Sequence, residues 1–295
     1  MTGPAADLVF DPVTVDLDGM LKRLHLANTR RVWKDLVARA DTESWPARRL
    51  LATLLVEEVA HRQQTRLSRE VRAAGFPFLK TIDDFDFSFQ KTLKRRLITS
   101  YLSPELVSEG RNVILFGRTG RGKTHLAIAI AYRAVQNGFS ARFVTAAHLI
   151  DDLSRASRDG RLREALAPYL HPAVLVIDEV GYLTYGNDAA NVLFHVVNER
   201  HLKRRPILFT TNKSPFTQWG EALHDSDLAE TIVDRTLERG QLLILDGPSY
   251  RTRHLPAPPL DTTEEPATIS GIKRPEFPEP ATTKASGRNC QCPAG

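Results

Sequence analysis

The residues from Gly117 to Thr124 read Gly-Arg-Thr-Gly-Arg-Gly-Lys-Thr, which fits the pattern G-x-x-x-x-G-K-[ST]. They follow a short apolar run at 112–116 and precede a helical pattern, the context that a phosphate-binding loop requires. The loop's glycines permit positive φ, so consecutive N–H groups can turn toward an anion. The Lys123 ammonium can neutralise the β- and γ-phosphates of a nucleotide, and the Thr124 hydroxyl is a natural Mg²⁺ ligand. The sequence therefore predicts a site for ATP and Mg²⁺, with nucleotide contacts from Gly117, Arg118, Thr119, Gly120, Arg121, Gly122, Lys123, Thr124 and His125.

Two carboxylates follow a second apolar run, Ala-Val-Leu-Val-Ile, which ends directly before Asp178 and Glu179. Alternation along a strand would point these two side chains in opposite directions. We predict that Asp178 reaches the metal through water, and that Glu179 is the base for the attacking water. The alternative, that acidic residues merely end the strand, is disfavoured by the phosphate-loop sequence upstream.

Two further candidates depend on where later elements lie. Asn212 ends the run Thr210-Thr211-Asn212, and it can orient the lytic water if its strand lies between the two motif strands; Thr211 is the second choice. A turn-forming asparagine is the alternative. Arg235 is a candidate for an arginine that reaches the γ-phosphate of a neighbouring subunit, and an ion pair with Glu238 on its own helix is the alternative.

These residues require an alternation of strands and helices. We predict strands at 112–116, 141–145, 173–178, 206–210 and 242–245, and helices near 123–137, 147–167, 187–202 and 226–239. Such alternation indicates an α/β core with a parallel sheet covered on both faces. The helix at 147–167 is long for a connection and contains several arginines.

The N-terminal third is predicted to be helical and basic. Helical periodicity runs over 20–39, and a second helix opens near Ser44, a possible N-cap, and continues to about Ala74. Lys and Arg outnumber Asp and Glu here, and one face of the second helix carries Arg62, Arg66, Arg69 and Arg72. This arginine stripe can follow a phosphate backbone or can simply be solvated; the sequence leaves both open. A short basic helix is predicted over 90–101.

The ends of the chain differ in composition from the middle. We predict a leader at 1–19, a helical DNA- or partner-binding domain at 20–80, a linker with a basic helix at 81–110, the ATPase domain at 111–255 and a disordered, proline-rich tail at 256–295. Cys290 and Cys292 in the tail match no zinc motif and make a poor disulfide. The 295 residues carry a net charge of +5, with no apolar run long enough for a membrane span and no basic, signal-like N-terminus. We therefore expect a cytoplasmic protein.

Several segments together resemble the IstB family of helper ATPases in insertion-sequence transposition, which are AAA+ proteins similar to DnaC-type helicase loaders. These segments are GRTGRGKTHLAIAIAYRA, VIDEVGYL, TTN, FTQWGE, IVDRTLERG and SYR, and the resemblance covers about residues 20–253. It implies an AAA+ core with a five-stranded parallel sheet, a homo-oligomer on double-stranded DNA and engagement of the element's transposase. It also implies that Lys123 binds the phosphates, that Thr124 and Asp178 bind the metal ion, and that Glu179 is the catalytic base. Asn212 would be the residue that senses the γ-phosphate, and Arg235 the arginine finger that acts on the site of a neighbouring subunit. This sequence departs from the family pattern at two positions: Arg118 stands where a proline is commoner, and Arg121 stands where a small residue is commoner.

The functional prediction is an ATP-dependent transposition helper that promotes target-DNA selection. A replicative helicase loader of the DnaC kind shares the same ATPase core and stays open as an alternative. A scaffold that binds ATP without hydrolysis is disfavoured, because Lys123 and Glu179 are both present.

Overall fold

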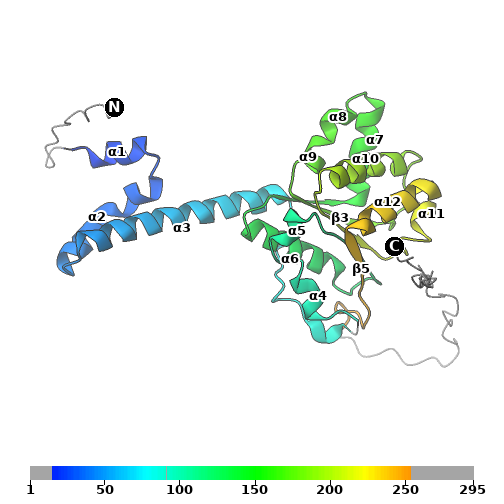
Figure 1. Ribbon diagram of the computed structural model, residues 1–295, viewed down its shortest axis with the longest axis horizontal. Helices are drawn as coiled ribbons and strands as arrows, with labels where there is room; N and C mark the ends of the chain where they lie inside the picture. The colour runs from blue at the N-terminus through cyan, green and yellow to red at the C-terminus, as the bar shows by residue number, and fades with distance from the viewer. Residues whose placement is uncertain (1–14, 91, 254–295) are drawn as a thin grey trace, which may run out of the picture. The chain divides into compact units, whose positions relative to one another are not determined.

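The computed structural model describes residues 15–90 and 92–253 (Figure 1). The predicted leader, 1–19, is described only from residue 15. The predicted tail at 256–295, with Cys290 and Cys292, lies outside the described residues.

The core is one five-stranded parallel sheet in the order β2-β3-β4-β1-β5. The strands are β1 Asn112–Phe116, β2 Ala141–Thr145, β3 Val174–Val180, β4 Ile207–Thr211 and β5 Gly240–Ile244. The predicted α/β fold class with a five-stranded parallel sheet is confirmed. The order also places β4 between β1 and β3, which is the condition set above for a sensor at the end of β4.

Helices cover both faces of this sheet (Figure 1). The core helices are α6 Lys123–Gln136, α7 Ala146–Arg158, α8 Leu162–Ala165, α9 Ala167–Leu170, α10 Ala189–Leu202, α11 Trp219–Leu223 and α12 Ser226–Glu238. Successive strand residues enter different hydrophobic clusters: Ile114 packs with α7, α10 and α12, whereas Val113 and Leu115 pack with α6. Because both faces are buried, the middle of β1, β3 and β4 is a continuous apolar run rather than an alternation of apolar and polar residues.

The prediction of one helix over 147–167 is wrong. α7 ends at Arg158, and Gly160 follows with a left-handed φ of 68°, a conformation that favours glycine and ends helices. The chain then forms the two short helices α8 and α9. Two arginines of this segment pair locally, Arg155 with Asp151 at 2.8 Å and Arg161 with Asp159 at 2.9 Å.

The N-terminal region forms α1 Leu17–Arg23, α2 Ala27–Thr42 and α3 Ala47–Ala74. The prediction of one helix over 20–39 is wrong, because the chain breaks between α1 and α2, where His25 has a φ of 55°. The cap prediction at Ser44 is also wrong: Ser44 lies in the turn with a φ of 52°, and Pro46 is the N-cap residue of α3. The end of α3 before Gly75 is as predicted.

A buried carboxylate joins α2 to α3. The Glu58 carboxylate accepts hydrogen bonds from the Thr29 backbone N–H at 2.8 Å, the Thr29 hydroxyl at 3.1 Å and Arg62 Nε at 2.9 Å. Burial alone would raise the pKa of Glu58, but these hydrogen bonds outweigh burial and hold the pKa below its usual value. Arg62 is thereby part of the helical packing.

The segment between α3 and β1 contains η1 Phe87–Phe89, α4 Arg95–Thr99 and α5 Glu105–Ser108. The basic helix predicted over 90–101 is therefore only five residues long. Two side chains fasten this segment to the phosphate-loop region. The Gln90 amide donates to the Arg121 carbonyl at 2.9 Å, and His125 Nε2 donates to the Thr81 carbonyl at 2.9 Å.

A fully buried arginine organises the end of the sheet opposite the phosphate loop. Arg200 of α10 donates to the backbone carbonyls of Tyr169, Pro172, Ala173 and Pro206 at 2.8–3.0 Å. These carbonyls belong to the chain entering β3 and β4, so one guanidinium satisfies acceptors that water does not reach.

We expect Arg200→Met to lower the free energy of unfolding by about 3–5 kcal/mol, because the buried carbonyls lose charged donors. Denaturant titration would measure this effect. Lys203→Met, at an exposed site on the same stretch of chain, is the control and should change stability by under about 0.5 kcal/mol. Equal stability of the two variants would show that Arg200 is not a structural anchor.

Candidate active site

The phosphate-loop glycines adopt the predicted left-handed backbone. Gly120 has a φ of 81° and Gly122 a φ of 85°, and α6 begins directly after Gly122. A Cβ on Gly122 would lie 2.6 Å from Cε2 of Phe85, and one on Gly120 would lie 2.2 Å from the Ser249 hydroxyl oxygen. Neither position can hold a side chain without displacing a neighbour, so glycine is required there for packing as well as for φ.

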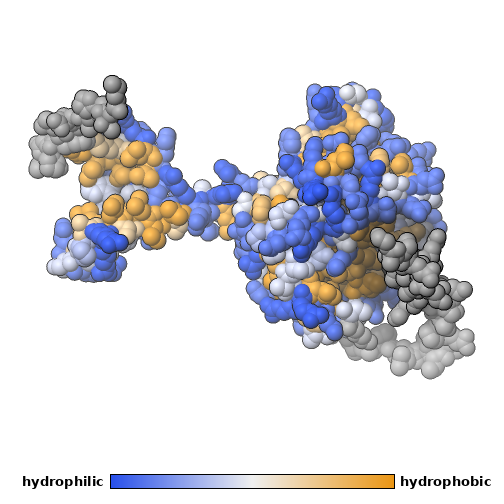
Figure 2. All heavy atoms as spheres, viewed as in Figure 1, coloured by the Kyte–Doolittle hydropathy of each residue, from blue (hydrophilic) through white to orange (hydrophobic). Residues whose placement is uncertain are grey.

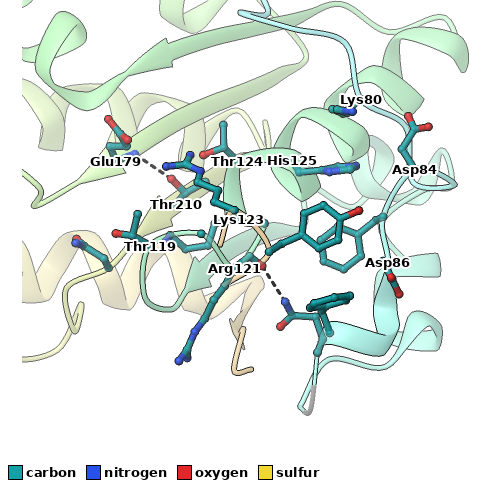
Figure 3. A pocket seen from close by; sticks show the side chains of 18 of the residues that line it. Lys80, Asp84, Asp86, Thr119, Arg121, Lys123, Thr124, His125, Glu179 and Thr210 are labelled. Carbon is teal, nitrogen blue, oxygen red and sulfur yellow. Dashed lines mark hydrogen bonds between the residues drawn. The ribbon is translucent and has the colours of Figure 1, made fainter. Parts of the chain in front are cut away.

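The loop opens into a cavity of about 300 Å³ (Figure 3). Seven of the nine predicted nucleotide contacts line it, from Thr119 to His125, whereas Gly117 and Arg118 do not. Lys123 Nζ donates to the Arg118 carbonyl at 3.0 Å. Burial lowers the pKa of Lys123, and the nearby Asp178 carboxylate opposes that shift. The guanidinium of Arg121 pairs with Asp246 beyond β5, which ties the loop to the strand next to β1.

The predicted metal ligands lie together. The Thr124 hydroxyl is 3.0 and 3.2 Å from the two carboxylate oxygens of Asp178, which is buried at the end of β3. Burial raises the pKa of Asp178, while hydrogen bonds from Thr210 and Thr124 and the Lys123 ammonium oppose the rise. A hydroxyl and a carboxylate at this separation offer the oxygen donors that Mg²⁺ prefers, so the residues fit the ion.

Asp178 and Glu179 diverge through a β-bulge rather than through simple alternation. Ile177 pairs with Phe209 and Val180 with Thr211, so Asp178 and Glu179 together face the single residue Thr210. Asp178 is buried, whereas Glu179 is exposed and lines the cavity, with a φ of 62°. The predicted divergence is therefore present, but its cause is the bulge.

Thr210 links the two acids, a role that the sequence analysis missed. Its hydroxyl donates to the Asp178 carboxylate and accepts the Glu179 backbone N–H at 2.9 Å (Figure 3). The sequence signal that could have indicated this role was the pair of polar residues, Thr210 and Thr211, at the end of an apolar strand. Thr211, the second choice for the sensor, instead donates to the Val180 carbonyl at 2.8 Å and accepts from Trp219 Nε1 at 3.2 Å. Thr211 is among the residues lining the cavity, but its hydroxyl is used in hydrogen bonds within the fold.

Asn212 lines the cavity from the end of β4. Its Oδ1 is buried and has no hydrogen-bond partner among the described residues. An unpaired buried amide oxygen is costly, which favours a role for Asn212 beyond turn formation.

Part of the cavity lining is aromatic, which the sequence analysis did not predict. The aromatic lining residues are Phe78, Phe85, Phe89, Tyr182 and Tyr250. The Phe89 and Tyr250 rings lie 5.0 Å apart, and the His125 ring contacts Phe85 edge-to-face at 5.2 Å. Burial lowers the pKa of His125, which favours the neutral ring. An apolar, aromatic wall beside a phosphate loop suits a nucleobase.

Residues 19–256 match the sequence profile of the IstB-like ATP binding proteins. The chain belongs to this family. It is 36% identical over 231 residues to an ATP-binding protein of insertion sequence IS5376 from Geobacillus stearothermophilus, covering 78% of this chain and 91% of that protein. It is 33% identical over 238 residues to an ATP-binding protein of insertion sequence IS21 from Pseudomonas aeruginosa, covering 81% of this chain and 89% of that one. The crystal structure of the DnaC helicase loader is similar with a TM-score of 0.44 and 23% identity, over 60% of this chain and 99% of that chain.

This IstB-like chain is therefore an ATPase of the AAA+ class, as the resemblance implied. The family match from residue 19 to 256 agrees with the predicted extent of about 20–253. Its cavity also contains Arg251 from the SYR segment, which the sequence analysis quoted only as part of the resemblance. Arg251 is close enough for its charge to add to the burial that lowers the pKa of Lys123, and to oppose the rise that burial causes in the pKa of Asp178.

Arg235 of this IstB-like ATPase lies on α12, and it is not among the residues lining the cavity of its own chain. Its guanidinium lies over the Phe194 ring, 4.8 Å from the ring centroid. The alternative ion pair with Glu238 is not found among the described residues, and Glu238 instead lies 3.2 Å from His201. The nearby Arg239 donates to the His201 carbonyl, so its side chain is used within the fold.

Proposed function

We propose that this IstB-like ATPase is a transposition helper that assembles as a homo-oligomer on double-stranded DNA with ATP and Mg²⁺. In this proposal it engages the transposase of its own insertion sequence and promotes target selection in the cytoplasm. The observation that carries the proposal is that Thr124, Glu179 and Asn212 line one cavity, with Asp178 hydrogen-bonded to Thr124. The relatives of this chain at 33% and 36% identity are insertion-sequence proteins, which favours transposition over helicase loading, the alternative left open by the sequence.

The chain's own groups suit hydrolysis as follows. Lys123 and the loop N–H groups hold the phosphates, while Thr124 and Asp178 would hold Mg²⁺. That ion neutralises phosphate charge when it is bound. Asn212 orients a water molecule and Glu179 takes its proton as the water oxygen bonds to the γ-phosphorus. The bond to the β,γ-bridging oxygen breaks, and ADP and phosphate leave.

The N-terminal helices offer two surfaces for partners. Four exposed apolar side chains lie on α3: Leu51, Leu55, Val56 and Val59. Figure 2 shows hydrophobic surface on these N-terminal helices. An apolar surface of this kind supports contact with a protein partner. The arginine stripe on the same helix supports contact with DNA phosphates.

The structure divides that stripe into two pairs. Arg62 donates to the His25 carbonyl and Arg66 to the Gly138 carbonyl, both at 2.6 Å, so these two arginines also hold the fold together. Arg69 and Arg72 are exposed and have no backbone acceptor among the described residues. Arg69 and Arg72 are therefore the residues with which to test DNA binding.

We expect Arg69→Gln combined with Arg72→Gln to weaken duplex DNA binding and to reduce the slope of log affinity against log salt by about 1 for each arginine. The physical reason is that fewer counterions are released when fewer phosphates are neutralised. Fluorescence anisotropy over a salt series would measure the slope. Lys203→Gln, an exposed change on the ATPase core, is the charge control. An unchanged slope in the double variant would mean that the stripe is only a solvated face.

A co-sedimentation assay with an insertion-sequence transposase, and separately with a replicative helicase, tests the partner. Retention of the transposase in the presence of ATP and DNA is expected. Retention of the helicase alone would overturn the transposition proposal in favour of helicase loading.

A further inference from the structure

Glu179 is held in an unfavourable backbone conformation. Its φ of 62° is left-handed, a conformation that costs a residue with a side chain about 1 kcal/mol or more. The β-bulge at Asp178 and Glu179 is what requires it. Such strain persists only where neighbouring contacts hold the backbone, so the contacts of this turn determine where the Glu179 carboxylate lies.

Four hydrogen bonds hold the turn. The Glu179 N–H donates to the Thr210 hydroxyl at 2.9 Å on the side of β4. The Tyr182 N–H donates to the Glu179 carbonyl at 3.3 Å. On the other side the Tyr185 hydroxyl donates to the Glu179 carbonyl and accepts the Gly181 N–H, both at 3.2 Å. One hydroxyl therefore bridges the residues on either side of Val180.

Tyr185 is itself fixed in place from outside this turn. Its ring packs against the hydrophobic cluster formed by α7, α10 and α12. Its backbone N–H donates to the Ala222 carbonyl at 3.3 Å, and His224 Nε2 donates to the Tyr185 carbonyl at 3.0 Å. Burial raises the pKa of Tyr185 to about 12, so the hydroxyl keeps its proton at all ordinary pH values. It can therefore donate and accept at once.

We propose that Tyr185 is a positioning residue for ATP hydrolysis, whose hydroxyl bridge holds the left-handed Glu179 backbone and thereby aims the Glu179 carboxylate into the cavity. This inference rests on the proposed role of Glu179 as the base. Tyr185 does not line the cavity, so it acts through Glu179 and not on the nucleotide. Its anchors are Ala222 in α11 and His224 at the C-terminal end of α11, which connects the turn to the segment leading into α12, the helix that carries Arg235.

The test is Tyr185→Phe, which removes the bridging oxygen and keeps the ring. Misplacing a catalytic group by about 1 Å can cost about 100-fold in rate. We therefore expect kcat for ATP hydrolysis to fall at least about 10-fold, while the Kd for ATP stays within about twofold. The matched control is Tyr169→Phe, another buried tyrosine of the same cluster, whose hydroxyl donates to Asp152 at 2.8 Å and lies away from the turn. It should lower the melting temperature without reducing kcat.

A double variant separates this inference from the proposed function. If Tyr185 acts through Glu179, adding Tyr185→Phe to Glu179→Gln should reduce the single-turnover rate no further. The same fold-loss in both backgrounds, or normal kcat in Tyr185→Phe alone, would overturn the positioning role while leaving the base assignment intact. Wild-type hydrolysis by Glu179→Gln would instead overturn the base assignment, on which the inference depends.

Discussion

Glu179→Gln is expected to bind ATP with nearly unchanged affinity and to lose about 10²–10⁴-fold in kcat, the usual contribution of a general base. The amide keeps the size and hydrogen-bonding capacity of the carboxylate but cannot take a proton from water. Glu179 is exposed to the cavity and makes no ion pair among the described residues, so its loss should leave the fold undisturbed. Phosphate release and nucleotide binding, measured on the same preparation, give kcat and Kd separately.

Two further variants serve as comparisons for Glu179→Gln. Lys123→Ala should weaken nucleotide binding itself, because it removes the ammonium that faces the β- and γ-phosphates. Glu164→Gln makes the same chemical change at an exposed position on α8 and should leave both quantities unchanged. Wild-type turnover by Glu179→Gln would remove Glu179 from the mechanism.

The phosphate loop and the strands could be predicted because local chemistry determines them. The glycines at 120 and 122 have positive φ, and the buried parallel strands contain continuous apolar runs, such as the one that precedes Asp178 in β3. The place of Asn212 was only conditional, since strand order depends on pairing between residues about 100 positions apart. The structure satisfied that condition by placing β4 in the middle.

The errors in the helices arose from single residues. The expectation of a helix over 147–167 treated Gly160 as tolerated within a helix, whereas it adopts the left-handed conformation that ends one. Ser44 is a good N-cap by type, but Pro46, closer to the helix, occupies the cap position of α3. Such choices depend on small differences in free energy that packing decides.

The aromatic wall and the Tyr185 bridge could not be predicted from local pattern. Phe85 lies almost forty residues before Lys123, and only the fold brings its ring against Gly122. The Tyr185 hydroxyl bonds to backbone atoms, which every residue has, so the residue types around it do not indicate this contact. The bulge at Asp178 likewise became visible only in the pairing register.

Arg235→Ala is expected to bind ATP normally and to hydrolyse it about 10³–10⁵ times more slowly, the range measured for arginine fingers in phosphoryl transfer. The reason is that Arg235 lies outside the cavity of its own chain, and we propose that it contributes to a neighbour's site instead. Arg235→Lys keeps a positive charge over the Phe194 ring but loses the planar fork of donors, and it should also be slow. A Lys variant as active as the wild type would argue against a finger.

If Arg235 acts in trans as we propose, ATP hydrolysis is a joint property of two subunits, and mixing two inactive variants tests this. Lys123→Ala cannot hold ATP but still supplies Arg235, and Arg235→Ala holds ATP but lacks the finger. When the two proteins assemble together on duplex DNA, some interfaces combine an intact phosphate loop with an intact Arg235. Phosphate release should then rise well above the sum of the separate proteins. No rise in a mixture whose co-assembly has been verified, or full activity of Arg235→Ala alone, would contradict the shared site.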